Sequence, residues 1–215
     1  MIPTRAASAR MPATGQDIQL LFPVLFLVGI GIVMVYSASS ALAVKKFGAD
    51  YYFLKKQALF ALVGICALVA CRHIPYTTYR PLAYPLLAIA VLLLAAVLFT
   101  PLGVTAGGSS RWLRLGPIRF QPSEFARLAL IVYLAYSMER KADRIGEFSI
   151  GVLPHAAVLG VLCLLVLKQP DFGSAAIMAV LTGLMLFVGG VKLIYLLAAC
   201  VAGTAAGACI ITFAG

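Results

Sequence analysis

The sequence has little charge and few acidic, histidine or tryptophan residues. Only 11% of its 215 residues are charged, with seven Asp and Glu, two His and one Trp, whereas 63% are hydrophobic. Soluble globular and disordered chains both need far more polar residues, so this composition excludes them. A mean hydropathy of +1.03 indicates an integral membrane protein.

Metal-ligand patterns are also lacking. No C-x-x-C pair occurs, and neither His73 nor His155 lies at ligand spacing from a cysteine. The sequence therefore shows no metal site and no cofactor, and it leaves a role for a divalent cation open. We interpret the two histidines as solvated or capping residues at helix ends. The cysteines are interpreted as small packing residues: Cys66, Cys71, Cys163, Cys200 and Cys209.

Apolar runs long enough to cross a ~30 Å hydrocarbon core as helices fill most of the chain. No alternating ten-residue pattern suggests a barrel, so an all-α, polytopic transmembrane helical bundle is predicted. We expect 1–17 to be a disordered cytoplasmic tail and 18–215 to be one transmembrane domain, with a turn at 189–192. The seven predicted spans are 18–40, 54–71, 82–99, 123–138, 152–168, 171–190 and 193–213.

Lysine and arginine are divided almost evenly between the two faces that seven spans define. The face that includes the N-terminus holds eight of them with four acids, and the other face holds nine with three acids, which leaves +4 and +6. The positive-inside rule therefore does not orient the chain. A basic face outside the membrane suits an anionic ligand or a lipid headgroup, but a misplaced span or an inverted chain would give the same count.

Two predicted helix starts on the basic face share one design. Each has a proline at the expected first helical position and a carboxylate in the expected first turn. With nearby cations they would form a cradle for phosphate oxygens, although capping alone explains each start equally well. The segments are Gln121-Pro122-Ser123-Glu124 and Gln169-Pro170-Asp171-Phe172-Gly173-Ser174, and the cations are Arg111, Arg114, Arg119 and Lys168.

Other local patterns surround these starts. Glu124 and Arg127 are three residues apart, so they are predicted neighbours on one helix face, as a functional or a purely structural pair. The segment 103–120 alternates Trp112 and aliphatic residues with arginines, which predicts an amphipathic segment at the membrane interface or an ordinary aromatic anchor. Gly203 and Gly207 form a G-x-x-x-G motif, which indicates close helix packing.

Five segments together resemble the SEDS (shape, elongation, division and sporulation) family. They occur in the family's order, and YYFLKKQ with the long hydrophilic N-terminus is more similar to the division branch than to the elongation branch. The segments are VMVYSAS (33–39), YYFLKKQ (51–57), SSRWLRLG (109–116), FQPSEFARLALIVYLA (120–135) and KQPDFGSA (168–175).

The resemblance implies about ten transmembrane helices, of which seven lie here, in the bacterial inner membrane with the N-terminus in the cytoplasm. It also implies a peptidoglycan glycosyltransferase that polymerises lipid II, an undecaprenyl diphosphate-linked disaccharide, during septal cell-wall synthesis. The implied partners are a class B penicillin-binding protein, other divisome proteins and membrane lipid, with no nucleic acid. A lipid II flippase and a non-catalytic divisome scaffold are the alternatives.

Glycosyl transfer needs a base for the acceptor hydroxyl and positive charge for the departing diphosphate. Arg127 stands where the family usually has lysine, which changes the donor geometry. The aspartate proposed as the family's catalytic residue lies beyond residue 215, so we expect a C-terminally truncated chain that is inactive alone. The predicted substrate-binding residues are Arg111, Trp112, Arg114, Glu124, Arg127, Lys168 and Asp171.

Overall fold

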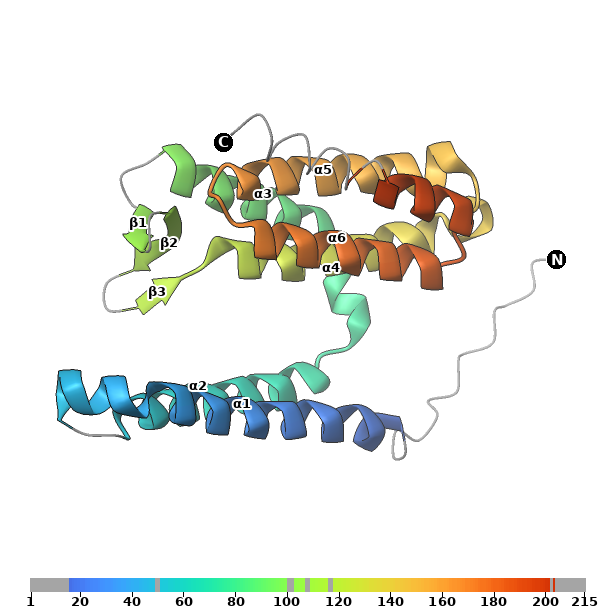
Figure 1. The fold of residues 1–215 in the computed structure, drawn as a ribbon. Coiled ribbons are helices and arrows are strands. Elements are labelled where there is room, and N and C mark those ends of the chain that lie inside the picture. The colour runs from blue at the N-terminus through green and yellow to red at the C-terminus, as the bar shows by residue number, and fades with distance from the viewer. Residues whose placement is uncertain are drawn as a thin grey trace. The chain divides into compact units, whose positions relative to one another are not determined.

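The computed structural model describes residues 16–48, 51–99, 103–106, 109–115, 118–201 and 203 (Figure 1). They divide into two compact units, Met1–Ile74 (unit 1) and Pro75–Gly215 (unit 2). Most described residues are helical, which confirms the predicted all-α class. Most of the predicted tail, 1–15, lies outside the described residues, whereas Gln16 and Asp17 already belong to the first helix.

Unit 1 consists of two apolar helices that pack against each other, α1 (Gln16–Phe47) and α2 (Tyr52–Arg72). Both have enough length and apolar character to cross a membrane, over Leu21–Ser40 and Tyr52–Arg72. Large apolar side chains such as Phe22, Leu27 and Phe60 are exposed. A helix that is apolar on all sides suits a bilayer, where the hydrocarbon takes the place of a protein core.

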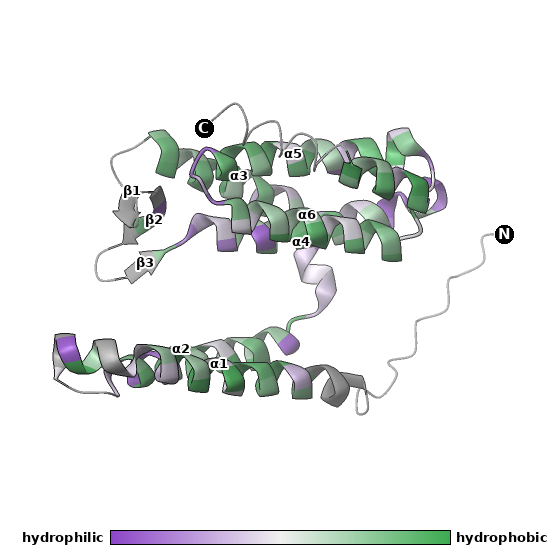
Figure 2. Cartoon of the chain, in the orientation of Figure 1, coloured by the Kyte–Doolittle hydropathy of each residue, from purple (hydrophilic) through white to green (hydrophobic). Residues whose placement is uncertain are grey.

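Unit 2 contains the remaining helices. Helical segments coincide with the predicted third to sixth spans, and residues 193–201 begin the seventh. Phe148–Leu167 is long and apolar enough to cross a membrane, while α3 and α6 are shorter apolar helices. Figure 2 shows hydrophobic residues along most of these helices. The elements are η1 (Tyr76–Tyr79), α3 (Ala83–Phe99), α4 (Pro122–Arg140), η2 (Ala142–Arg144), the π-helical turn η3 (Phe148–Val152), α5 (Leu153–Leu167) and α6 (Phe172–Val188).

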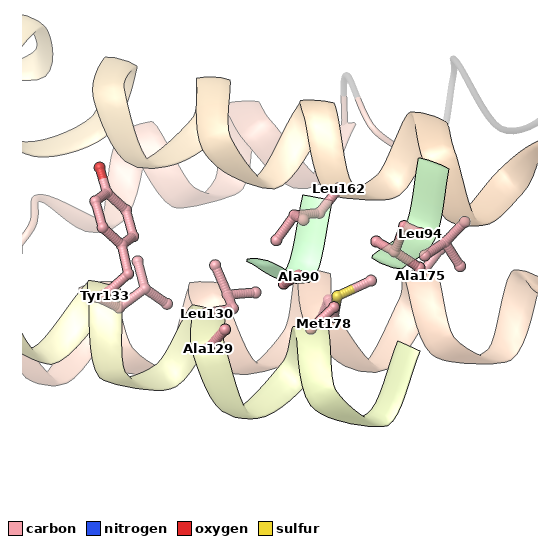
Figure 3. Packing of buried hydrophobic residues seen from close by; sticks show 11 residues of the cluster. Ala90, Leu94, Ala129, Leu130, Tyr133, Leu162, Ala175 and Met178 are labelled. Carbon is pink, nitrogen blue, oxygen red and sulfur yellow. The ribbon is translucent and has the colours of Figure 1, made fainter. Parts of the chain in front are cut away.

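The core of unit 2 is formed by side chains from α3, α4, α5 and α6 (Figure 3). On α4 the buried positions recur every three or four residues, as expected for one face of a helix. Ala90, Ala126 and Ala129 are almost completely buried, and such small side chains let membrane helices approach closely. The larger members include Leu94, Leu130, Leu134, Leu162 and Met178.

The segment between α3 and α4 folds into a small antiparallel sheet, where an interfacial amphipathic loop was predicted. Its strands are β1 (Gly103–Ala106), β2 (Ser109–Leu115) and β3 (Ile118–Phe120), in the order β1-β2-β3. Val104 pairs with Trp112 and Leu113 pairs with Phe120. Alternation of apolar and charged residues has the period of a strand, so the pattern identified earlier reflects this sheet.

The turns at the opposite end of unit 2 depend on glycine. α6 ends at Val188 and Gly190 has a φ of +93°, so the predicted turn at 189–192 is confirmed. A Cβ on Gly151 would lie 1.8 Å from the carbonyl oxygen of Ile145, so that close approach requires glycine. A second apolar cluster covers these turns, formed by Ile145, Val152, Leu186 and Val191.

Several predictions about single residues were wrong. Among the cysteines that the structure describes, Cys66, Cys71 and Cys200 are exposed, and only Cys163 is partly buried, near the carbonyl oxygen of Ala175. An apolar sequence cannot separate the two cases, because lipid-facing and core-facing positions of a membrane helix are equally apolar. Cys209 and Gly207 lie outside the described residues, so the G-x-x-x-G prediction is not tested.

His155 is fully buried, whereas a solvated or capping position at a helix end was predicted. Its Nε2 lies 3.0 Å from the Ser137 hydroxyl of α4, and its Nδ1 contacts the carbonyl oxygen of Gly151. The ring also packs at 6.0 Å from the ring of Tyr133. The histidine lies in the first turn of α5. Because its ring reaches Ser137 on α4, it links the two helices.

Candidate functional site

The starts of α4 and α6 lie together, as their shared design predicted. Ser174 Oγ lies 3.3 Å from Ser123 Oγ, and Ser123 Oγ in turn donates to Asp171 Oδ2 at 3.4 Å. The Gln121 amide donates to the same carboxylate oxygen at 3.3 Å and to Ser123 Oγ at 2.9 Å. We call these four residues, Gln121, Ser123, Asp171 and Ser174, the helix-start cluster.

Asp171 is the centre of this cluster. It is only 5% exposed, and Ser174 donates to it twice, from its backbone N–H at 3.3 Å and from its hydroxyl at 2.7 Å. The first of these bonds caps α6. The prediction for this start was therefore wrong in detail: Asp171 is the N-cap and Pro170 precedes it. At α4 the prediction is confirmed, since Gln121 is the N-cap and Pro122 follows it.

Arg111 connects the sheet to the helix-start cluster. It lies in β2, its Nη1 is 3.7 Å from Asp171 Oδ1, and its Nη2 donates to the carbonyl oxygen of Pro170. About a third of the Arg111 side chain is exposed, while its Nε is buried with no hydrogen-bond partner among the described residues. The guanidinium is thus fixed on its Asp171 side and keeps donors for another acceptor.

Glu124 and Arg127 form a separate pair on α4. Arg127 Nη1 donates to Glu124 Oε2 at 3.0 Å, which confirms the predicted neighbours on one helix face. The Glu124 side chain is 57% exposed and that of Arg127 is 23% exposed. No hydrogen bond or ion pair of the described residues joins this pair to the helix-start cluster, so the start of α4 carries two distinct polar groups.

The other predicted site residues are placed less centrally. Trp112 is partly buried in β2, on the opposite strand face from its neighbour Arg111. Lys168 is the exposed C-cap of α5, and the side chain of Arg114 lies outside the described residues. Gln169 is buried and donates to the Leu94 carbonyl oxygen at 3.0 Å, which ties α3 to the loop before α6.

Ser174 was not predicted as a site residue, although it belongs to the segment KQPDFGSA (168–175). The spacing Asp-x-x-Ser is the signal that identifies it, because a capping carboxylate accepts from the third residue after it. Gly173, between them, has open space around its Cα: an added Cβ would meet only Asp171 Oδ1, at 3.9 Å. The glycine is therefore not required for packing in this cluster.

Metal binding has no visible basis in the part of the chain that the structure describes. No three His, Cys, Asp or Glu side chains there come together as a group that could hold a metal ion. The helix-start cluster contains one carboxylate, and its remaining polar atoms are hydroxyls and an amide. Hydrogen bonding, with Arg111 as the cation, is the chemistry that this geometry supports.

Comparison with known proteins connects this site to one family. Residues 18–215 match the FtsW/RodA/SpoVE model, described as cell cycle protein. Over 181 residues, 84% of the chain, it is 48% identical to the probable peptidoglycan glycosyltransferase FtsW of Trichlorobacter lovleyi. It is also 35% identical over 180 residues, again 84% of the chain, to the stage V sporulation protein E of Bacillus subtilis. The chain spans 48% and 49% of these two relatives, so about half their length.

Solved structures show the same fold. A chain of a peptidoglycan synthase complex, studied for its coordination of polymerization and crosslinking, superposes with a TM-score of 0.61 at 30% identity, covering 81% of this chain and 51% of that one. The rod shape determining protein RodA of Thermus thermophilus gives a TM-score of 0.55 at 30% identity, with 80% and 57% covered. Each structure matches about four fifths of this chain, so the similarity extends well beyond a single motif.

Proposed function

Since the chain belongs to the FtsW/RodA/SpoVE family of cell cycle proteins, we propose that the protein carrying it is a peptidoglycan glycosyltransferase. The proposed reaction joins lipid II units into glycan strands during septal cell-wall synthesis. The names of the relatives support the reaction, and their identity to this chain favours the division branch. The chain itself is a multi-pass membrane protein, with three helices that meet the length and apolarity of a span.

The observation that supports this function best is the contact between Arg111 and Asp171. In the reaction an acceptor sugar hydroxyl attacks the anomeric carbon of the donor, and a polyprenyl diphosphate leaves. Negative charge develops on that diphosphate, so a positioned guanidinium lowers the barrier. Arg111 is fixed by Asp171 and Pro170, and it binds the diphosphate with its remaining donors. Lys168, three residues before Asp171, and Arg114, three residues after Arg111, supply further positive charge.

Asp171 is a positioning residue in this proposal, because its oxygens already accept from Ser174, Ser123 and Gln121. A carboxylate engaged in this way is poorly placed to take a proton from the acceptor hydroxyl. Glu124 and Arg127 border the site and contact the sugar or phosphate groups of the substrate. The proposed reaction uses no cofactor, and the base is not assigned within these residues.

The membrane arrangement follows from the same proposal. The N-terminus lies in the cytoplasm of a bacterial inner membrane, and the helix-start cluster lies at the outer surface with a class B penicillin-binding protein as partner. Labelling of single cysteines in whole cells tests this orientation. Lys55→Cys should react with an impermeant thiol reagent and Ala142→Cys should not, and the reverse result would contradict the proposal.

A polymerisation assay tests the function. The full-length protein and its partner are supplied with labelled lipid II, and glycan strands are separated by gel electrophoresis. Arg111→Ala should lower the turnover by roughly tenfold or more, because one positioned donor at a developing anion contributes about a hundredfold in enclosed sites and less where solvent reaches. Arg144→Ala, an exposed arginine in η2, is the control. Equal turnover of the wild type and Arg111→Ala would contradict the assigned role.

A further inference from the structure

Unit 2 contains a second polar feature at the other end of α4. A groove of about 220 Å³ runs between η1 and the last three turns of α4. Its α4 wall is aliphatic at Ile131, Val132 and Ala135, and charged where Glu139 faces Arg80. Three tyrosines complete the lining, Tyr76, Tyr79 and Tyr136. The groove is thus apolar along the helix and polar at the helix end.

This profile places the charged end of the groove at a membrane surface. α4 ends at Arg140, Lys141 follows it, and the next turns of chain are polar. Tyrosine side chains concentrate at this depth of a bilayer, where the ring is apolar and the hydroxyl meets water. A phospholipid lying along α4 would place its acyl chain on Ile131 and Val132 and its headgroup beside Arg80.

The charges at the polar end are complementary to a zwitterion. Arg80 Nη2 donates to Glu139 Oε1, and both side chains are about half exposed, at 43% and 51%. The guanidinium also lies over the Tyr76 ring at 5.6 Å, which holds it at the groove. A guanidinium has five donors and a carboxylate about four acceptor positions, so one shared bond leaves both groups able to bind further.

We propose that this groove is a binding site for an aminophospholipid headgroup of the phosphatidylethanolamine class. The phosphate accepts from Arg80, and the primary ammonium donates to Glu139. A choline headgroup has no N–H to donate, so it satisfies only the phosphate half of the site. A glycerol headgroup has no cation, and Glu139 repels its net negative charge. The expected preference is therefore ethanolamine over choline and over glycerol.

The chain supplies its own control for the ion pair. Arg144 and Glu147 form a second exposed arginine–glutamate pair, with Nε to Oε1 at 2.9 Å. They are outside the groove lining, and they are three residues apart instead of lying on two elements. Lipid binding that depends only on exposed charge would respond equally to both pairs. Binding in the groove would respond only to Arg80, which holds the phosphate, and to Glu139, which sets the headgroup preference.

Native mass spectrometry of the detergent-solubilised full-length protein, titrated separately with dioleoyl phosphatidylethanolamine, phosphatidylcholine and phosphatidylglycerol, tests the proposal. The wild type should retain phosphatidylethanolamine about fivefold more tightly than the other two, the effect of one added interfacial charge contact. Glu139→Gln should remove the preference, Arg80→Gln should weaken the retention of all three lipids, and Arg144→Gln should change neither. Exposed substitutions of this kind leave the protein folded.

The other outcomes overturn the proposal. Equal retention of all three lipids by the wild type would mean that the ion pair only closes the groove. Tighter retention of phosphatidylglycerol would indicate a simple anion site without a role for Glu139. An equal loss of lipid retention in Arg144→Gln and Arg80→Gln would assign the effect to general surface charge.

Discussion

Asp171→Ala should lower the free energy of unfolding by about 3 kcal/mol. The substitution removes the N-cap of α6, which costs about 1 kcal/mol. It also removes the acceptor of Ser174, Ser123 and Gln121, and one or two unsatisfied buried donors cost about 1 kcal/mol each. The 3.7 Å contact with the partly exposed Arg111 adds less than about 1 kcal/mol, because solvent screens it.

Asp171→Asn separates hydrogen bonding from charge. The amide oxygen still accepts from the Ser174 N–H and so keeps the cap. The other oxygen becomes an NH2 group, to which the two serine hydroxyls can turn as acceptors, so the Gln121 amide is the donor that loses its acceptor along with the charge. We expect a loss of about 1 kcal/mol, well below that of alanine. Asp143→Ala in η2 is the control: this exposed carboxylate makes no hydrogen bond or ion pair with the described residues, so its removal should change stability by less than about 0.5 kcal/mol.

Unfolding by SDS in mixed micelles, followed by tryptophan fluorescence, measures these values. The only tryptophan, Trp112, lies beside Arg111 in β2, so its emission reports on the region of the cluster. Combining Asp171→Ala with Ser174→Ala should show a coupling of about 1 kcal/mol, since the two residues share bonds. Two results would refute the reasoning: Asp171→Ala within about 0.5 kcal/mol of the wild type, or asparagine as damaging as alanine.

Three further predictions use other contacts. His155→Phe should cost about 1–3 kcal/mol in the same unfolding assay, because the buried Ser137 hydroxyl on α4 loses its hydrogen bond with the imidazole. Gly151→Ala should also destabilise, since its Cβ would lie 1.8 Å from a carbonyl oxygen, whereas Gly64→Ala, with open space, should not. The hydrogen bond from Arg144 lowers the pKa of Glu147, so Arg144→Gln should raise that pKa in an NMR titration. The small stabilisation from this pair is fully present above the ordinary glutamate pKa, and it is lost as the pH falls through the lowered pKa of Glu147. Unchanged stability of His155→Phe or Gly151→Ala, or an unchanged Glu147 pKa in Arg144→Gln, would contradict these expectations.

The site was predictable where it depends on local order. The first turn of α4 follows from Pro122, and the Glu124–Arg127 bond follows from a spacing of three residues on a helix. The Asp171–Arg111 contact joins residues 60 apart in the sequence, and only the tertiary fold brings them together. Sequence reasoning therefore identified both residues but interpreted them separately, as a first-turn carboxylate and a phosphate-binding cation.

The sequence by itself determined the membrane class and the positions of the helices, because a run of apolar residues must form a helix to satisfy its backbone in a bilayer. It also identified the family, through motifs that keep their order along the chain. The tertiary structure decided which apolar side chains meet each other and which face outward, as His155 and the exposed cysteines show. In a bilayer both surroundings are apolar, so hydropathy does not separate them, and only the packed helices do.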